Sequence, residues 1–188
     1  MITAQPRLKK SLVFMSKNKI SIFWFRRDLR LDDNMGLNMA LESGLPVLAI
    51  FIFDDEILDS LPKNDARVSF IYSALKEIDK RLKEKNSSLL IKKGNITKVW
   101  ISLIAEFDVK KVFLIRDYNP YAIQRDLEIK DFLESNSIEV LDVKHQVIFE
   151  KNDILKADGK PYTVYTPYKN KWLAKLKVEG INGLATKK

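Results

Sequence analysis

The chain has 188 residues, 46% of them hydrophobic and 31% charged, which fits one globular domain with a sizeable core. It contains no cysteine and one histidine, which excludes a disulfide framework and a thiolate metal site and argues against any transition-metal site. No apolar run approaches the roughly 18 residues that cross a bilayer, so we expect no membrane partner.

The formal net charge of +8 is concentrated at the two ends of the chain. Residues 151–188 carry nine cations and three acids, whereas residues 21–150 carry 19 cations and 22 acids. We therefore interpret the surplus as solvated surface and not as a footprint for DNA. The N-terminal segment lacks a clear period, and its apolar centre "SLVF" is too short for a secretory signal. We expect residues 1–18 to be a disordered extension and the protein to be cytoplasmic.

From residue 19 onward, apolar strand patterns alternate with helical patterns. The predicted strands are 20–25, 45–53, 88–94, 110–118 and 138–144. The predicted helices are 35–43, 65–85, 96–107 and 121–135, with a short helical turn in 55–61. Strands that are apolar throughout, separated by amphipathic helices, indicate a parallel sheet with helices on both faces. The predicted fold class is α/β: a doubly wound, five-stranded parallel sheet of order 3-2-1-4-5, Rossmann-like, in which strands one and four are neighbours.

Charged residues gather where three of these strands end. In a doubly wound sheet the carboxyl ends of strands one and four border a crevice that commonly binds a ligand. The rim residues follow strands one, two and four: Arg26, Arg27, Asp28, Arg30, Asp32, Asp33, Asp54, Asp55, Arg116, Asp117, Tyr118 and Asn119. Taken singly, each is explained as an ion-pair partner or a helix cap. Together they predict a ligand site, and we assign Asp28 and Arg30 to an ion pair within the loop.

The residue types at the rim suggest the kind of ligand. Neither the G-x-G-x-x-G pattern nor a phosphate-binding P-loop is present, and the first glycine after strand one is Gly36. Arginine forks can hold an anion, and Tyr118, Tyr121 and Phe53 could stack on a flat ring. These residues predict a planar, partly anionic small molecule. We identify no catalytic residue and interpret His145 as a structural or surface histidine.

Five segments carry a family resemblance: "FWFRRDLRLDDN", "ARVSFIYSALKEIDKRL", "LLIKKGN", "DYNPYAIQRDLEI" and "DGKPYTVYTPYKNKW". In this order they resemble the DNA photolyase/cryptochrome family over about residues 19–178. The pattern looks like the N-terminal α/β antenna-binding domain of a bacterial photolyase that repairs cyclobutane pyrimidine dimers. The resemblance implies UV-damaged DNA as the partner of the full-length protein, and a helical C-terminal domain that holds FAD.

Further expectations depend on this resemblance. Residues 179–188 would be a tail or the start of a linker, the helical FAD-binding domain would be absent from this chain, and the chain alone would be inactive. Matching to deazaflavin-binding relatives nominates Arg27, Phe51, Asp54 and Asp117 as cofactor-binding residues. Folate-binding relatives have an Asn-Glu pair where this chain has Tyr121 and Ala122, so the resemblance favours a deazaflavin over a folate.

The segment "GKPYTVYTPYKNKW" has two interpretations. It could form a hairpin and a helix that cover the sheet edge, or it could be the docking surface for the helical domain. In the second case Tyr162, Tyr165, Tyr168 and Trp172 would include exposed aromatics that favour a homodimer. Two other functions stay open at this point: a stand-alone protein-interaction module, and a nucleotide-binding α/β domain of a transferase or ligase.

Overall fold

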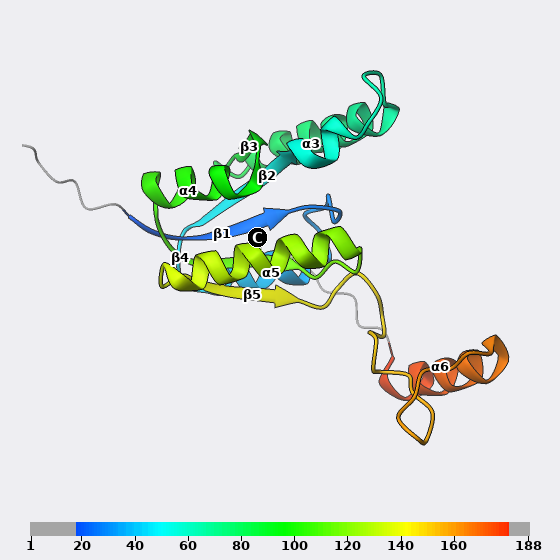
Figure 1. Cartoon of the computed structure of the whole chain (residues 1–188). Coiled ribbons are helices and arrows are strands. Elements are labelled where there is room, and N and C mark those ends of the chain that lie inside the picture. The colour runs from blue at the N-terminus through cyan, green and yellow to red at the C-terminus, as the bar shows by residue number, and fades with distance from the viewer. Residues whose placement is uncertain (1–17, 181–188) are drawn as a thin grey trace, which may run out of the picture.

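The computed structural model describes residues 18–180, so the expected N-terminal extension and most of the expected C-terminal tail lie outside the described residues. One parallel sheet forms the body of the protein, in the order β3-β2-β1-β4-β5 (Figure 1). Its strands are β1 (Lys19–Phe25), β2 (Val47–Asp54), β3 (Leu89–Gly94), β4 (Asp108–Ile115) and β5 (Glu139–Val143). The predicted fold class and strand order are confirmed, and β1 pairs directly with β4.

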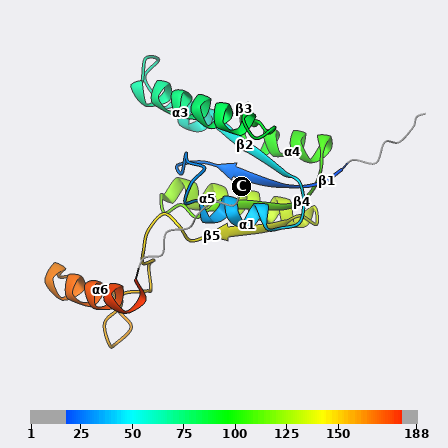
Figure 2. The same ribbon diagram turned by 180° about the vertical axis from the view of Figure 1, so that it is seen from behind.

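Helices lie on both faces of this sheet. They are α1 (Met35–Leu41), α2 (Asp55–Asp59), α3 (Ala66–Lys83), α4 (Ile96–Glu106), α5 (Pro120–Ser135) and α6 (Tyr165–Glu179). Helices α1 and α3 pack on one face, and α4 and α5 pack on the other (Figures 1 and 2). The two faces therefore have separate hydrophobic clusters, as expected for a sheet that is buried on both sides.

Strand β1 contributes to both clusters because successive side chains point to opposite faces. Ile22 and Trp24 join the cluster with α4 and α5, whereas Phe23 and Phe25 join the cluster with α1 and α3. The Trp24 ring also makes an edge contact with Trp100 of α4, with ring centroids 5.5 Å apart. The continuous apolar sequence of β1 is thus explained by burial on both faces.

Polar caps start most of the helices directly after a strand or a short loop. The side chains of Asn34, Asn95 and Asn119 accept hydrogen bonds from the first turns of α1, α4 and α5. Asp54 and Asp65 do the same for α2 and α3. Each cap satisfies a backbone N–H that has no partner within its helix. The caps bring the first turns of α2 and α5 to the edge of the sheet at which β1, β2 and β4 end.

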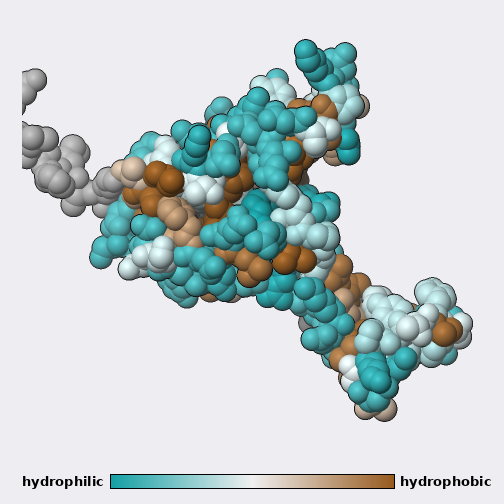
Figure 3. All heavy atoms as spheres, viewed as in Figure 1, coloured by the Kyte–Doolittle hydropathy of each residue, from teal (hydrophilic) through white to brown (hydrophobic). Residues whose placement is uncertain are grey.

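Helix α6 does not cover the sheet. It stands away from the body on an extended connection that exposes apolar groups (Figures 1 and 3). None of its residues, all of which the structure describes, is buried, and the Tyr165 side chain is 72% exposed. The interpretation as a helix covering the sheet edge is therefore wrong. Its hydrophobic residues do not collect on one face, so packing against the sheet would have buried charged groups as well.

A small polar contact attaches α6 to the end of β5. Asp153 pairs with Lys144, which follows β5, and its carbonyl accepts a hydrogen bond of 3.1 Å from Nζ of Lys175 on α6. Beside it the Phe149 and Trp172 rings meet edge to face, with centroids 5.4 Å apart. The hydrogen bond from Lys144 is the main cause that lowers the pKa of the Asp153 carboxyl, and the Glu150 N–H also contributes.

We expect Asp153→Asn to loosen α6 by about 1 kcal/mol, because asparagine loses the ion pair with Lys144 and the 3.9 Å ion pair with Lys175 of α6, both of which are partly exposed. Amide hydrogen exchange in α6 would rise about fivefold, while exchange in the sheet would stay the same. Because the folded-state pKa is lowered, this contribution is present above about pH 4 and is lost as the pH falls through the folded pKa. Asp158→Asn is the matched control, since within residues 18–180 the Asp158 carboxylate accepts only from the N–H of Lys160. Equal exchange in both variants would contradict the role of Asp153.

Within the described residues, no helix has the length and apolar character needed to cross a membrane.

Candidate functional site

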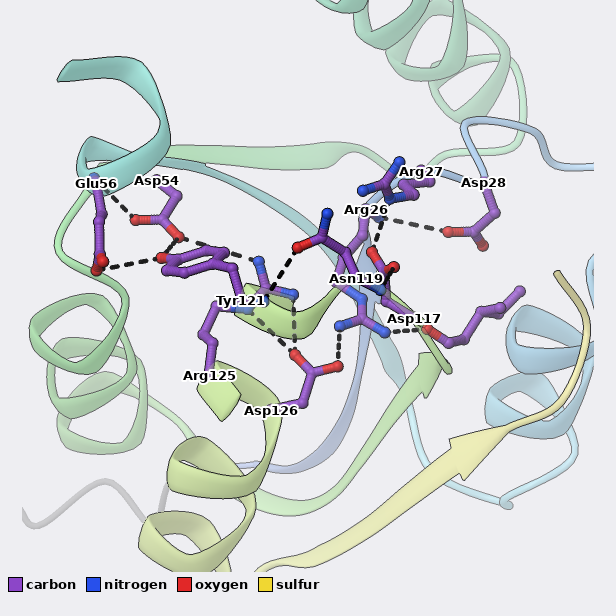
Figure 4. A network of polar contacts seen from close by, with 11 residues as sticks. Arg26, Arg27, Asp28, Asp54, Glu56, Asp117, Asn119, Tyr121, Arg125 and Asp126 are labelled. Atoms are coloured by element: carbon purple, nitrogen blue, oxygen red, sulfur yellow. Dashed lines mark hydrogen bonds and ion pairs between the residues drawn. The ribbon is translucent and has the colours of Figure 1, made fainter. Parts of the chain in front are cut away.

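A cavity of about 590 Å³ opens at the carboxyl edge of the sheet, above the ends of β2, β1 and β4. Helices α2 and α3 wall one side, and the first turns of α5 wall the other. The α2–α3 side is largely apolar and is lined by Phe51, Phe53, Ile57, Leu61, Val68 and Ile71. The opposite wall is polar and is lined by Arg27, Asp54, Asp117, Asn119, Tyr121 and Arg125 (Figure 4). An apolar cavity of this size with a few convergent polar groups has the character of a small-molecule site.

An ion pair between Arg27 and Asp117 connects the β1 and β4 ends of this wall. Nε of Arg27 lies 2.7 Å from Oδ2 of Asp117. Burial raises the pKa of Asp117, but the N–H of Asn119 and the Arg27 guanidinium together outweigh it, so the pKa lies below its usual range. The carboxylate is 9% exposed, whereas the Arg27 side chain is 61% exposed. The pair thus combines a buried anion with a cation whose side chain is largely exposed.

A second carboxylate, Asp54, lies at the end of β2. It is 6% exposed and accepts a 2.5 Å hydrogen bond from the hydroxyl of Tyr121 on α5. It also accepts from the backbone N–H of Glu56, in the first turn of α2. Burial and then this hydrogen bond raise the pKa of Tyr121, so its hydroxyl keeps its proton and remains a donor. Asp54 therefore joins the two sides of the cavity at one edge.

Two arginines lie against the buried Trp24 ring at the base of the cavity. The guanidinium carbons of Arg26 and Arg125 are 5.4 and 5.1 Å from its centroid. Asp126 pairs with both arginines, with Arg125 at 2.9 Å, and Arg26 also donates to the Ile115 carbonyl (Figure 4). Their side chains are only 7% and 12% exposed, so Asp126 provides the charge compensation that lets them lie inside the protein.

All four residues nominated for cofactor binding line this one cavity: Arg27, Phe51, Asp54 and Asp117. Tyr121 and Phe53 line it too, as expected for stacking groups. Tyr118 is different, because its hydroxyl bonds Glu150 at 2.5 Å and its side chain is not part of the cavity wall.

Trp24, Arg125 and Asp126 were not predicted as residues of this site. Trp24 lies within an apolar strand, a pattern that predicts a core position. The sequence of α5 contains a signal that could have identified Arg125, because Tyr121 and Arg125 are four residues apart and lie on one face of the first two helical turns. That spacing directs both side chains toward the edge at which the strands end.

In the loop after β1 a second prediction is wrong. Asp28 and Arg30 do not form an ion pair. The Asp28 carboxylate accepts from Nδ2 of Asn34 at 2.9 Å, and Arg30 donates its Nε to the Asp33 carbonyl at 2.9 Å. Burial is the largest cause that raises the pKa of Asp28. A neutral amide is the better partner here, because Asn34 is fully buried and caps α1 with its other side-chain atom.

We expect Asp28→Ala to lower the free energy of unfolding by about 1 kcal/mol, because the buried Nδ2 of Asn34 would keep only its bond to the Arg30 carbonyl. Asp32→Ala in the same loop is the control, since Asp32 is exposed and pairs only with Arg81. Denaturant titration of both variants measures the difference, and equal midpoints would refute this role for Asp28.

The raised pKa of Asp28 has a consequence for Asp28→Asn. The folded state holds the Asp28 proton more tightly than the unfolded state, so wild-type stability falls as the pH rises from about 4 through the folded-state pKa. Asparagine keeps an acceptor for Asn34 and removes this dependence. The stability difference, wild type minus Asp28→Asn, should therefore become more negative between pH 4 and pH 7.

Residues 21–186 match the DNA photolyase family. A deoxyribodipyrimidine photo-lyase from Synechococcus is 31% identical over 156 residues, covering 83% of this chain and 32% of the relative. A (6-4) DNA photolyase from Arabidopsis thaliana is 29% identical and covers 82% of this chain. The chain thus spans about a third of the length of these relatives.

Solved structures agree with these relatives. A class III photolyase from Agrobacterium tumefaciens superposes on 92% of the chain with a TM-score of 0.73 and 27% identity, and the match covers 34% of that protein. A photolyase from Sulfolobus tokodaii, described with two FAD molecules and a novel light-harvesting cofactor, covers 70% of the chain at 33% identity and a TM-score of 0.61. This chain, with its five-stranded sheet and the cavity at its carboxyl edge, belongs to the DNA photolyase family and corresponds to the N-terminal α/β domain of its members.

Proposed function

We propose that the cavity holds an antenna chromophore with a tricyclic deazaflavin-type ring. The observation that carries this proposal is the pairing of an apolar, aromatic wall with two buried carboxylates across one cavity of about 590 Å³. A flat heterocycle can pack against Phe51 and Phe53, while its ring N–H or side-chain hydroxyl groups donate to Asp54 or Asp117. Arg27, on its exposed side, can donate to a ring carbonyl.

The role of such a group in the whole protein is light collection. A bound antenna absorbs light and passes the excitation to a flavin, which does the chemistry. In this proposal the flavin belongs to a helical FAD-binding domain, the substrate is UV-damaged DNA with pyrimidine dimers, and residues 1–188 alone have no repair activity. The residues of this chain bind and orient the antenna ring and keep water away from one of its faces.

An absorption spectrum tests the antenna proposal. The purified chain is mixed separately with a 5-deazaflavin, a methenyl folate and FAD, passed through gel filtration, and scanned beyond the Tyr and Trp bands. We expect the deazaflavin to be retained at near 1:1 stoichiometry and the folate not to be.

Val68→Trp should abolish retention, because Val68 lines the cavity and the larger ring would fill it. Phe70→Trp, on the same helix and 76% exposed, is the matched control. Retention of no chromophore by the wild type, or equal retention by both variants, would refute the proposal.

One observation favours a second role, protein interaction through α6. An isolated helix of 15 residues is marginal in water, and all of α6 lies away from the sheet. We propose that its exposed aromatics, among them Tyr165 and Tyr168, dock against the helical domain in the full-length protein. In the 188-residue chain the same surface would favour a homodimer. Sedimentation of the chain and of Tyr165→Ser measures this: a dimer that dissociates in the variant supports the role, and a monomeric wild type excludes the homodimer.

A further inference from the structure

A smaller cavity of about 270 Å³ adjoins the chromophore cavity. It lies among the loop after β1, the end of β4 and the loop after β5, and three residues line both cavities: Arg26, Arg27 and Asp117. The ion pair of Arg27 and Asp117 therefore belongs to the partition between them. A ligand whose ring fills the larger cavity would reach the smaller one by extending a flexible substituent past this ion pair.

The lining of the smaller cavity is dominated by guanidinium groups. Arg26, Arg27, Arg30 and Arg116 all contribute, together with the side chains of His145 and Gln146. Two carboxylates are also present, but each accepts hydrogen bonds from the protein: Asp28 from Asn34, and Asp117 from Arg27 and the backbone of Asn119. The cavity thus presents more cationic donors than anionic acceptors.

The four arginines differ in how many of their guanidinium N–H groups already have a partner in the protein. Arg26 pairs with Asp126, and Arg116 pairs with Asp142 at 2.7 Å and with Glu150 at 2.6 Å. Arg27 and Arg30 each use only Nε, toward Asp117 and toward the Asp33 carbonyl. Within residues 18–180 the terminal nitrogens of these two side chains have no hydrogen-bond partner, and Arg30 forms no ion pair. Two guanidinium forks are therefore available at one small cavity.

A fork of this kind fits a phosphate, whose oxygens accept two parallel hydrogen bonds from one guanidinium. Resting on the proposed chromophore site, we propose that the smaller cavity binds a phosphate group carried by the chromophore, with Arg30 and Arg27 as its donors. The ligand class is then a phosphorylated flavin-type compound, and the neutral ring alone is a weaker ligand.

Riboflavin and FMN separate the two sites, because they have the same ring and differ by one phosphate. We expect the 188-residue chain to bind FMN about tenfold more tightly, which is the effect of one charge-assisted hydrogen-bond set. Arg30→Gln should reduce this ratio to about one and leave riboflavin affinity unchanged. Arg67→Gln is the matched control, because Arg67 lines the larger cavity but not the smaller one, and its side chain is 71% exposed. A wild-type ratio near one, or a ratio that depends on Arg67 and not on Arg30, would overturn the phosphate site.

Pyrophosphate tests the smaller cavity without a chromophore. At constant ionic strength and at ten times its dissociation constant, it should raise the melting temperature by about 3–6 °C over chloride, and not in Arg30→Gln. If neither flavin binds but this Arg30-dependent shift is seen, the chromophore proposal fails and the anion site stands. If riboflavin and FMN bind equally and pyrophosphate gives no shift, the chromophore site stands and the phosphate site is refuted.

Discussion

Asp126→Ala is expected to lower the free energy of unfolding by about 3 kcal/mol, because it leaves two buried arginines without their shared carboxylate. Arg26 would keep the Ile115 carbonyl, and Arg125 would keep only Asp54 at 4.0 Å. Both guanidinium groups lie against Trp24, so their rearrangement would disturb the base of the larger cavity. We therefore also expect weaker chromophore retention in this variant.

The double variant Arg26→Met/Asp126→Ala separates lost charge compensation from lost packing. Removing the uncompensated cation should recover part of the loss, since methionine fills similar space without a charge. Glu134→Ala on α5 is the control, because Glu134 is half exposed and pairs with Lys130 at 3.8 Å; it should cost less than 0.5 kcal/mol. Chemical denaturation measures all three variants. An Asp126→Ala loss no greater than that of the control would show that Asp126 is dispensable.

Gly36→Val is expected to cost about 3 kcal/mol, at the upper end of overpacking in a core. A Cβ atom at Gly36 would lie 2.8 Å from Cε2 of Phe23 and 3.2 Å from Cγ1 of Ile115, so α1 would have to move off the sheet. Ile115 ends β4, and its carbonyl accepts from Arg26. The displacement should thus reach both cavities and reduce ligand retention as well as stability.

Two comparisons isolate this effect. Leu41→Ala changes an exposed residue of the same helix and should cost less than Gly36→Val. Phe23→Leu combined with Gly36→Val should recover part of the loss, because the shorter side chain frees the space that the new methyl groups need. If Phe23→Leu adds its full cost to that of Gly36→Val, the clash with Phe23 is not the cause.

The sheet of this protein could be predicted because its signal is local. An apolar strand such as β1 and the amphipathic pattern of α3 have periods that are readable within one segment. Once five such strands alternate with helices, the right-handed crossover leaves few strand orders. The predicted ends of the elements differ from the observed ones: β4 stops at Ile115, three residues before the predicted end, and the side chains of Arg116, Asp117 and Tyr118 form ion pairs and hydrogen bonds with other segments.

The helix α6 shows where a local signal is insufficient. Its sequence predicts a helix, and a helix is present, but its position depends on which surface buries its apolar groups. Among the described residues that contact includes the edge contact of Trp172 with Phe149, Lys175 over the Phe149 ring and the ion pair of Lys175 with Asp153, and no residue of the helix is buried by it. Whether this helix covers the sheet edge depends on tertiary packing, which the periodicity of a single helix does not determine.

That charged residues gather at one edge of a parallel sheet could be predicted from the residues alone, since a strand and the loop that follows it are neighbours along the chain. The pairs that they form depend on the folded chain: Arg26 with Asp126, Arg27 with Asp117 and Asp28 with Asn34, around two cavities with a shared wall. A partly buried charge needs an ion-pair partner that lies close to it in the folded protein, whatever their separation in the sequence. For Arg26 that partner is 100 residues away.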